Sequence, residues 1–311
     1  MKILITGGTG LIGSALTRSL LNNDYQITVI SRTPDLVDPR CEAIPWDLDL
    51  ITQEIKSSKA VINLAGASIS GSNPLSMRWT EKRKSLIASS RIQAGDLLLQ
   101  AIQRSTHKPE IIIQASAIGY YGNQGSQPVD ENSPPGKDFL ADVCQTWENS
   151  TAGVEELGIR RIVTRLGLVL SGEGGLLPLL ALPFKFYFGG PIGNGLQQMS
   201  WIHVDDVVHS ILHFMNNPST QGIFNLTAPV PIQNLTFSEA LGKSLNRPSW
   251  LPIPPWALKI ILGEASTLAV DGREVIPFRL LESGYKFNFK EIDPALKDLF
   301  QKINNKENVL E

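Results

Sequence analysis

Three glycines near the amino terminus have the spacing of a turn that binds phosphate. They follow the apolar stretch 3–6, which is typical of a short buried strand, and precede an amphipathic segment over 11–21. Such a unit needs glycine where the turn is tight, where the backbone approaches a pyrophosphate and where the helix packs on the strand. The free N–H groups that begin the helix favour an anion. We predict that a dinucleotide contacts Gly7, Thr9, Gly10, Leu11, Ile12 and Gly13.

The end of the second expected strand, Gln26–Ile30, indicates which dinucleotide would bind. At this position an acidic residue favours a free ribose 2′-hydroxyl, and an arginine favours a 2′-phosphate. Ser31 and Arg32 stand here, and no acid does. Because a guanidinium and a hydroxyl suit a phosphate, we expect NADP rather than NAD. The alternative is an Arg32 that lies on the surface without a ligand.

Two further strand ends offer contacts to the cofactor. Asp47 and Leu48 follow a weak strand over 42–45, and the carboxylate would either accept from the adenine amino group or cap the loop. Ala65 and Gly66 end a strand over 60–67, where small residues let the cofactor pass over bare backbone.

A long helix is expected from residue 80. Its apolar side carries Leu86, Ile87, Ala94, Leu97, Leu98 and Ala101, consistent with packing against a sheet. Arg83, Lys84 and Arg91 lie away from this stripe. A solvated helix face is the simpler interpretation, and contact of Arg91 with cofactor phosphates is the alternative.

A parallel sheet would bring these residues together. Five strand-like stretches up to residue 116 alternate with helical ones, and parallel neighbours need right-handed crossover connections. Their carboxyl ends then meet at one edge, where open α/β sheets bind ligands. We expect an α/β fold with a doubly wound parallel sheet of the Rossmann type. The core would span residues 1–170, with 197–228 returning to it, and 171–311 would form a smaller lobe on the substrate side.

Several elements are also expected in the carboxyl-terminal part. Residues 236–239 have the pattern of a capping box that opens a helix, and Pro255 suits the start of another. Residues 284–289 alternate like an edge strand, and a last helix follows from Asp293.

Composition limits the classes of partner. The 311 residues include 28 Lys and Arg against 30 Asp and Glu, so no broad basic face indicates nucleic acid or an anionic membrane. Cys41 and Cys144 are far apart and have no metal-ligand spacing, which favours reduced thiols and no metal site. We see neither a membrane-length apolar run nor a signal-peptide pattern and expect a cytoplasmic protein. A homodimer is one state that the sequence allows.

Together, the motifs resemble the extended short-chain dehydrogenases/reductases of the nucleotide-sugar epimerase/dehydratase type. This resemblance rests on the glycine stretch 6–13, the strand end 63–66, Ser116 followed by Tyr121-Gly122, and the run 203–206. A narrower resemblance, to an atypical subgroup of epimerase-family proteins that are sometimes called cell-division inhibitors, covers essentially the whole chain. It rests on the stretches 78–80, 116–122, 139–141 and 200–203 and on the tail from Pro229.

The resemblance implies substrate contacts and also marks a departure. It implies that Arg78, Trp79, Gln198 and Trp201 line the substrate site and that the Ser116 hydroxyl holds the reacting oxygen. The wider family uses a Tyr-x-x-x-Lys pair on the helix after the fifth strand, where the lysine lowers the pKa of the tyrosine. Here the aligned positions hold Leu140 and Cys144, or Phe139 and Val143, and no lysine lies between residues 137 and 185.

The missing pair leaves Ser116 and Tyr120 as the catalytic candidates, in that order. A phenol without a neighbouring cation has a pKa of about 10 and is a poor base at neutral pH, and ring packing is an equal interpretation for Tyr120. We therefore expect an NADP-binding epimerase- or reductase-like protein that acts on an unknown small molecule. The alternative is a non-catalytic NADP-binding redox sensor or scaffold, because a fold alone does not establish catalysis.

Overall fold

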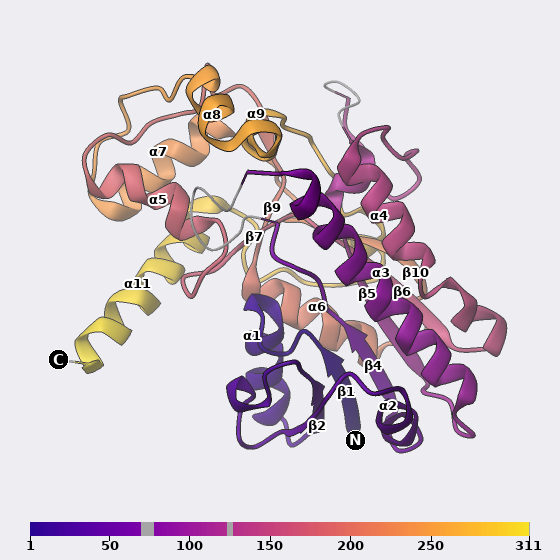
Figure 1. Cartoon of the computed structure of the whole chain (residues 1–311). Helices are drawn as coiled ribbons and strands as arrows, with labels where there is room; N and C mark the ends of the chain where they lie inside the picture. The colour runs from indigo at the N-terminus through magenta and orange to yellow at the C-terminus, as the bar shows by residue number, and fades with distance from the viewer. Residues whose placement is uncertain (70–77, 123–126, 311) are drawn as a thin grey trace.

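The computed structural model describes residues 1–69, 78–122 and 127–310 and contains a parallel sheet flanked by helices (Figure 1). Within these residues the sheet has seven strands in the order β10-β6-β5-β4-β1-β2-β3, and every neighbouring pair is parallel. The predicted doubly wound parallel sheet is confirmed. The strands are β1 (Lys2–Thr6), β2 (Gln26–Ile30), β3 (Glu42–Ile44), β4 (Ala60–Asn63), β5 (Ile111–Ala117), β6 (Arg160–Leu166) and β10 (Gly222–Leu226).

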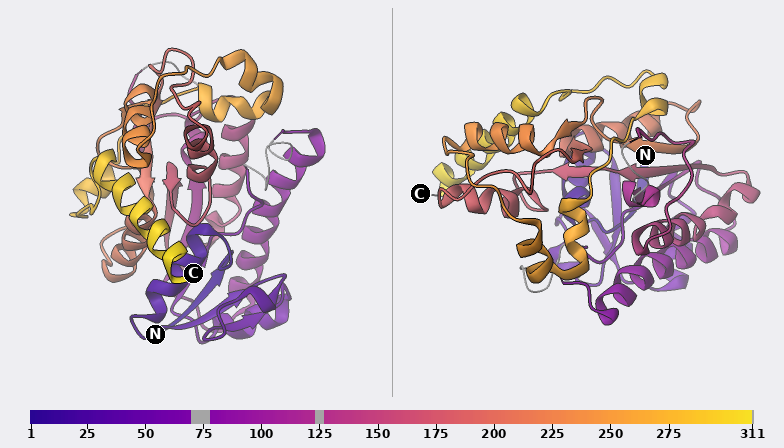
Figure 2. Two further views of the ribbon diagram at one scale, coloured as in Figure 1. Left: turned by 90° about the vertical axis from the view of Figure 1, so that its left-hand side faces the viewer. Right: turned by 90° about the horizontal axis from the view of Figure 1, so that it is seen from above.

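Helices cover both faces of this sheet (Figure 2). One face packs against α1 (Leu11–Leu21) and α6 (Val204–Asn216), and the other against α2 (Leu48–Ile55), α3 (Glu81–Arg104) and α4 (Phe139–Asn149). The central strands are buried on both sides, which is why they consist of Ile, Leu and Val rather than of an alternating pattern. Short 3-10 helices occur at Pro34–Leu36, Ile118–Tyr121 and Ala152–Leu157.

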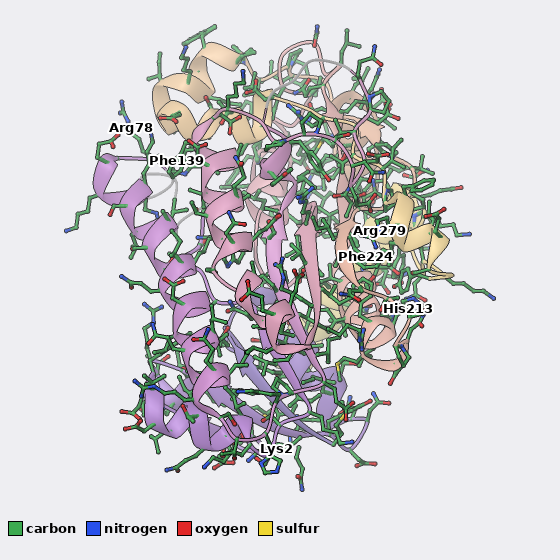
Figure 3. All side chains as sticks on the ribbon, turned by 90° about the vertical axis from the view of Figure 1, so that its right-hand side faces the viewer. Lys2, Arg78, Phe139, His213, Phe224 and Arg279 are labelled. Carbon is green, nitrogen blue, oxygen red and sulfur yellow. The ribbon has the colours of Figure 1, made fainter. Side chains whose placement is uncertain are left out.

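The carboxyl-terminal part gathers above the carboxyl ends of the strands (Figure 1). It has its own apolar core, in which Leu177, Phe237 and Leu296 are buried. Figure 3 labels Lys2 at the amino ends of the strands and Arg78 near the opposite end. The helices here are α5 (Leu177–Lys185), α7 (Asn234–Leu245), α8 (Pro255–Leu262), α9 (Thr267–Val270) and α11 (Ile292–Leu310), with a 3-10 turn at Gly263–Ser266. The short helix α10 (Phe278–Glu282) instead packs beside β10, and its Leu280 belongs to the core at the sheet. Two small pairs join β7 (Leu168–Leu170) to β9 (Trp201–His203) and β8 (Gln198–Met199) to β11 (Ile232–Gln233).

Two local predictions in this part are wrong. Residues 284–289 form no strand, because the buried Asp206 carboxylate accepts from the Asn288 N–H at 2.8 Å and the Phe289 N–H at 2.9 Å in place of a sheet neighbour. The capping box at 236–239 does not start a helix either, since α7 already begins at Asn234. The predicted starts of α8 at Pro255 and of the last helix near Asp293 are confirmed.

Two residues of the long helix α3 have a different burial from the one predicted. The helix begins after Thr80, whose Oγ1 accepts from the Arg83 N–H at 3.2 Å, as expected for a cap. Leu86, expected in the buried stripe, is 45% exposed, whereas Arg91, expected on a solvated face, is buried. The apolar stripe therefore begins only at Ile87.

Candidate nucleotide-binding site

The glycine turn between β1 and α1 is closed by backbone contacts that exclude larger side chains. The Gly10 N–H donates to the Gly7 carbonyl at 3.0 Å. Gly7 has a φ of +69°, and a Cβ there would lie 2.6 Å from the Leu64 carbonyl oxygen. A Cβ on Gly13 would collide with the Gly7 carbonyl. Glycine is thus required at 7 and 13 by the turn and by the approach of α1 to β1, as the spacing predicted.

The start of α1 differs from the starts of the other sheet-covering helices. Its N-cap residue, Gly10, offers no side-chain acceptor, and its first turn contains no acid. By contrast, a side chain accepts a backbone N–H at the start of each of α2, α3, α4 and α6, namely Asp47, Thr80, Asp138 and His203. Because the first amides of a helix need an acceptor, the uncapped start of α1 is suited to an anion supplied by a ligand.

A buried chain of polar side chains supports the turn from below. Thr6 Oγ1 donates to Asn63 Oδ1 at 2.6 Å, and Asn63 Nδ2 donates to Gln114 Oε1 at 2.8 Å. Thr6 Oγ1 also accepts from the Ala65 N–H at 3.2 Å. These bonds join β1, β4 and β5 at their carboxyl ends, so the backbone at Ala65 is held beside the glycine turn.

The end of β2 carries the two residues predicted to select the dinucleotide. Ser31 is buried, and its hydroxyl accepts from the Thr33 N–H at 3.0 Å. Arg32 is exposed, and no ion pair or hydrogen bond of its guanidinium is found within the described residues. β2 is the direct neighbour of β1, so this cation comes two residues after the strand next to the one that leads into the glycine turn.

The structure assigns local roles to Asp47 and Arg91. Asp47 Oδ1 accepts from the N–H groups of Asp49 at 3.0 Å and Leu50 at 2.9 Å, so this carboxylate caps α2, one of the two roles considered for it. Its neighbour Leu48 is the first residue of that helix.

Arg91 Nη1 donates to the Ala67 and Ile87 carbonyls at 3.0 and 2.8 Å, and the guanidinium stacks on the Trp147 ring. Burial lowers the pKa of Arg91 to about 10. A Cβ on Gly66 would meet this guanidinium at 2.9 Å, so Arg91 packs under the strand end that carries Ala65 and Gly66. Its contact with cofactor phosphates stays a prediction.

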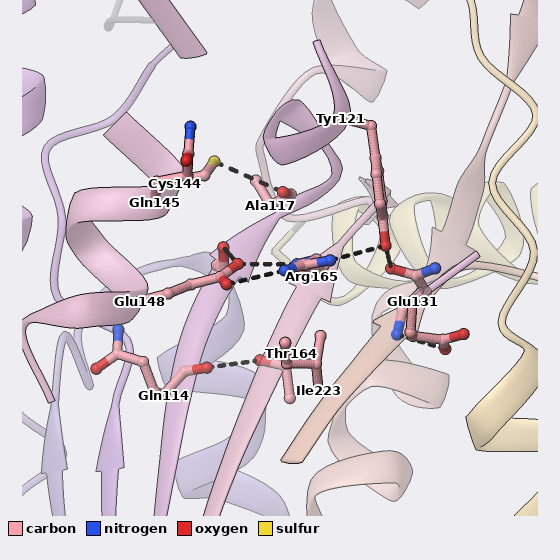
Figure 4. A network of polar contacts seen from close by, with 12 residues as sticks. Gln114, Ala117, Tyr121, Glu131, Cys144, Gln145, Glu148, Thr164, Arg165 and Ile223 are labelled. Atoms are coloured by element: carbon pink, nitrogen blue, oxygen red, sulfur yellow. Dashed lines mark hydrogen bonds and ion pairs between the residues drawn. The ribbon is translucent and has the colours of Figure 1, made fainter. Parts of the chain in front are cut away.

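Ser116 belongs to a buried ionic network at the carboxyl ends of β5 and β6. Figure 4 shows Glu148, Arg165 and Tyr121 of this network. Its hydroxyl donates to Glu148 Oε1 at 2.6 Å. Both carboxylate oxygens of Glu148 accept from the Arg165 guanidinium, at 2.9 and 3.0 Å. Arg165 Nη1 also donates to the Tyr121 hydroxyl at 3.1 Å, and that hydroxyl donates to Asn225 Oδ1 at 2.7 Å.

Burial determines the charge behaviour of this network. Arg165 and Ser116 are each 1% exposed. Burial opposes the charge on Arg165, but its bonds to Glu148 raise its pKa above the ordinary arginine value. Burial also raises the pKa of Tyr121 to about 12, which keeps this phenol protonated at neutral pH. Tyr121 therefore stays neutral and Arg165 stays charged, and their hydrogen bonds hold both side chains in place at the strand ends.

The remaining catalytic candidate, Tyr120, lies over this network. The Arg165 guanidinium carbon is 3.3 Å from the centroid of the Tyr120 ring, and the ring meets Tyr121 edge to face. The expectation that these phenols lack a neighbouring cation is wrong, because Arg165 comes from a strand 40 residues further along the chain. Cys144, at an expected dyad position, is buried, and burial raises its pKa to about 12. This thiol supplies neither a base nor a nucleophile.

The four residues expected at the substrate have different environments. Gln198 lines a cavity of about 420 Å³ between the sheet edge and the carboxyl-terminal helices. Arg78 is exposed beside Gly263 at the start of α3, and Trp79 is buried against Phe139. Trp201 is fully buried in the second core and does not belong to the described cavity lining. The expectation for Trp201 is therefore corrected to a packing role, because inward-facing β9 places its ring between helices.

His203 lies in the one cluster of His and carboxylate groups that metal geometry would allow among the described residues. Its ring Nδ1 accepts from the Asp205 N–H at 3.1 Å, and its Nε2 is 3.2 Å from Asp298 Oδ2. Lys302 Nζ lies 2.8 Å from both Asp205 and Asp298. The lysine ammonium already supplies the positive charge between these carboxylates, so these ion pairs account for the cluster.

Glu148 and Arg165 are the site residues that sequence reasoning missed. Glu148 falls on the side of α4 that carries Cys144 one turn earlier, and Arg165 follows the buried stretch 162–164 of β6. A carboxylate and a guanidinium at interior positions of neighbouring elements are the signal that could have indicated a buried pair.

The fold and the glycine turn define a doubly wound α/β protein with a nucleotide-type strand–turn–helix unit. The chain belongs to the NAD dependent epimerase/dehydratase family, whose model matches residues 3–227, and residues 253–299 match a domain of unknown function. An epimerase family protein of Staphylococcus saprophyticus is 40% identical over 95% of this chain and 98% of its own length. A chloroplastic epimerase family protein of Arabidopsis thaliana is 38% identical over 97% of this chain and 87% of its own.

Solved structures agree with this assignment. The crystal structure of the human epimerase family protein SDR39U1 (isoform 2) with NADPH has a TM-score of 0.87 and 32% identity, over 96% of this chain and 99% of that chain. The atypical epimerase-family resemblance is thereby confirmed. None of the described helices has the length and apolar character that a bilayer-spanning segment needs.

Proposed function

We propose that this chain binds NADP(H) across the glycine turn and acts as an NADP-dependent oxidoreductase or epimerase on a small molecule. The observation that carries the proposal is the uncapped start of α1 behind a glycine turn, with the exposed Arg32 at the end of the adjacent strand. The pyrophosphate would accept from the amides of α1, and Arg32 would pair with the 2′-phosphate. The human relative solved with NADPH supports this choice of cofactor.

The residues fit this cofactor in two independent ways. The glycines leave the backbone open where a Cβ would block it, and no side chain of the described residues caps the helix amides. Nicotinamide would supply hydride exchange when bound. Ser116 and Tyr120 are the proposed groups for holding or moving the proton at the substrate oxygen; Glu148 would position the first and Arg165 the second.

The second candidate is a non-catalytic protein that binds NADP(H) without converting a substrate. It is favoured by one observation: α4 presents Leu140 and the protonated Cys144 thiol where the wider family has its catalytic pair. Ser116, at 1% exposure with its hydroxyl hydrogen-bonded to Glu148, is also poorly placed to meet a substrate.

Two measurements separate these candidates. Titration of the purified chain with NADPH and NADH, followed by nicotinamide fluorescence, tests the binding. We expect saturable binding that favours NADPH. Oxidation of bound NADPH is then followed with a panel of carbonyl compounds, for the wild type and for Tyr120→Phe and Ser116→Ala. The enzyme hypothesis is supported if the wild type oxidises NADPH with one of these compounds and either variant loses this activity while it keeps its affinity for NADPH. Tight NADPH binding without any turnover supports the binding protein, and no binding of NADPH contradicts both.

A further inference from the structure

The cavity lined by Gln198 lies next to the proposed chemistry. Ile118 and Gly119, two and three residues after Ser116, form its wall on the sheet side. Leu168, at the start of β7 after β6, contributes to the same region. Opposite them stand side chains of α5, α7 and α8. Its volume of about 420 Å³ falls in the range of sites for small ligands.

The lining is mainly aliphatic and aromatic. Charged side chains in its described part are limited to Asp138, Asp271 and Arg273. Two of these are already engaged, because Asp138 Oδ1 caps α4 through the Ala141 N–H at 2.9 Å and Arg273 Nη1 donates to the Tyr121 carbonyl at 2.9 Å. Two carboxylates face one guanidinium, so the walls carry no excess of positive charge. A diphosphate entering this space would meet two carboxylates and a single guanidinium, so its charge would not be compensated, which is costly.

Few polar side chains in the lining stay available. Ser200 Oγ donates to the Arg273 carbonyl, and Asn234 Oδ1 accepts from the Ile192 N–H. No hydrogen bond among the described residues uses the side chains of Gln198 or Ser238. The cavity therefore offers the Gln198 amide and the Ser238 hydroxyl to a ligand, beside the Asp271 carboxylate, on a mainly apolar background.

Several exposed residues of the lining are large and apolar. Leu182, Ile261 and Leu268 belong to the lining and are 47%, 52% and 36% exposed. Exposed hydrophobic residues beside a cavity are typical of a site that takes an apolar ligand.

We propose that this cavity binds an uncharged, predominantly apolar molecule with a single carbonyl or hydroxyl group, and not a nucleoside-diphosphate sugar. Gln198 would donate to or accept from the ligand oxygen, and the leucine side chains of α5 would cover its apolar body. This proposal rests on the proposed function only in taking the cavity as the substrate side of the nicotinamide, since binding to it is measurable without turnover.

The test compares two kinds of ligand by calorimetry, with and without saturating NADPH. The apolar probes are carvone, acetophenone and cyclododecanone, and the polar probe is UDP-glucose. We expect at least one apolar probe to bind with a stoichiometry near one and UDP-glucose not to compete with it. Binding of UDP-glucose, or the absence of binding by all three carbonyl compounds, overturns the proposal.

Two variants place the binding in the cavity. Leu179→Arg puts a cation into the lining on α5, and Leu86→Arg places the same change on the exposed face of α3, outside the lining. We expect about a tenfold or greater loss of affinity for the apolar probe in the first, because a charged side chain then occupies the wall that the probe contacts, and no change in the second. Equal losses in both would mean non-specific surface binding and would overturn the proposal.

A milder variant provides a second test in case Leu179→Arg does not fold. Gln198→Leu keeps the volume and apolarity of the wall and removes the amide, so we expect the affinity for a carbonyl probe to fall by roughly threefold to tenfold. An unchanged affinity contradicts the role of Gln198. The NADPH titration is read separately: failure of NADPH to bind, with the apolar probe still bound, refutes the proposed function and leaves the cavity assignment standing.

Discussion

Replacing Glu148 by glutamine should destabilise the fold by removing the charge that compensates Arg165. The guanidinium is 1% exposed and forms two bonds of 2.9 and 3.0 Å to this carboxylate. Removing one partner of a buried pair costs about 3–5 kcal/mol, since the other charge stays buried without compensation. Glutamine keeps one acceptor oxygen, so we expect a loss of about 3 kcal/mol in the free energy of unfolding.

Urea unfolding at neutral pH measures this loss. We expect a lower midpoint with an unchanged m-value for Glu148→Gln, which identifies a change in stability rather than in compactness. Ser116→Ala is the matched control, because it removes the 2.6 Å hydrogen bond to the same carboxylate but leaves the ion pair. That variant should lose only about 1 kcal/mol.

A double-mutant cycle decides whether the pair itself is responsible. Glu148→Met and Arg165→Met should each be strongly destabilising, and the double variant should be much less so than their sum, because it leaves no buried charge. Additive effects, or a loss below about 0.5 kcal/mol for Glu148→Gln, would refute the reasoning that this network is an obligate ion pair.

Three further predictions address the turn, a helix cap and a buried histidine. Gly13→Ala should abolish NADPH binding and lower the melting temperature, because its Cβ would strike the Gly7 carbonyl; nicotinamide fluorescence and a thermal scan check this. Asp47→Ala should cost about 1 kcal/mol in urea unfolding by removing the α2 cap, while the NADPH affinity stays unchanged; a large loss of affinity would instead show contact with adenine. Burial lowers the pKa of His203 below its ordinary value of 6.5, so the unfolded chain binds more protons below that pH. The melting temperature should therefore fall as the pH falls through that window, and less steeply for His203→Gln.

The sheet could be predicted from the sequence because several of its strands carry short apolar runs, such as Ile3–Ile5 in β1 and Ile111–Ile113 in β5. The limits of α1 and β2 and the start of α3 were predicted for this reason. The segment 284–289 could not be, because its backbone groups are satisfied by Asp206, a side chain some 80 residues away whose position depends on the folded chain.

The candidate site divides in the same way. The glycine turn is local, so its residues follow from spacing alone. The environment of Tyr120 is not local, because Arg165 and Glu148 reach it from a distant strand and helix. Arg91 and Trp201 also depended on tertiary packing: one was expected in solvent and the other at the substrate, and both are buried.

The most direct test of the central claim is the ratio of the dissociation constants for NADH and NADPH, measured for the wild type and for Arg32→Ala. The charge-assisted bonds of one arginine to a phosphate correspond to about 1.5–3 kcal/mol, so the wild type should prefer NADPH by roughly tenfold or more. In Arg32→Ala this preference should fall close to one, through weaker binding of NADPH alone. A preference that survives the substitution, or no binding of either dinucleotide by the wild type, would contradict the account.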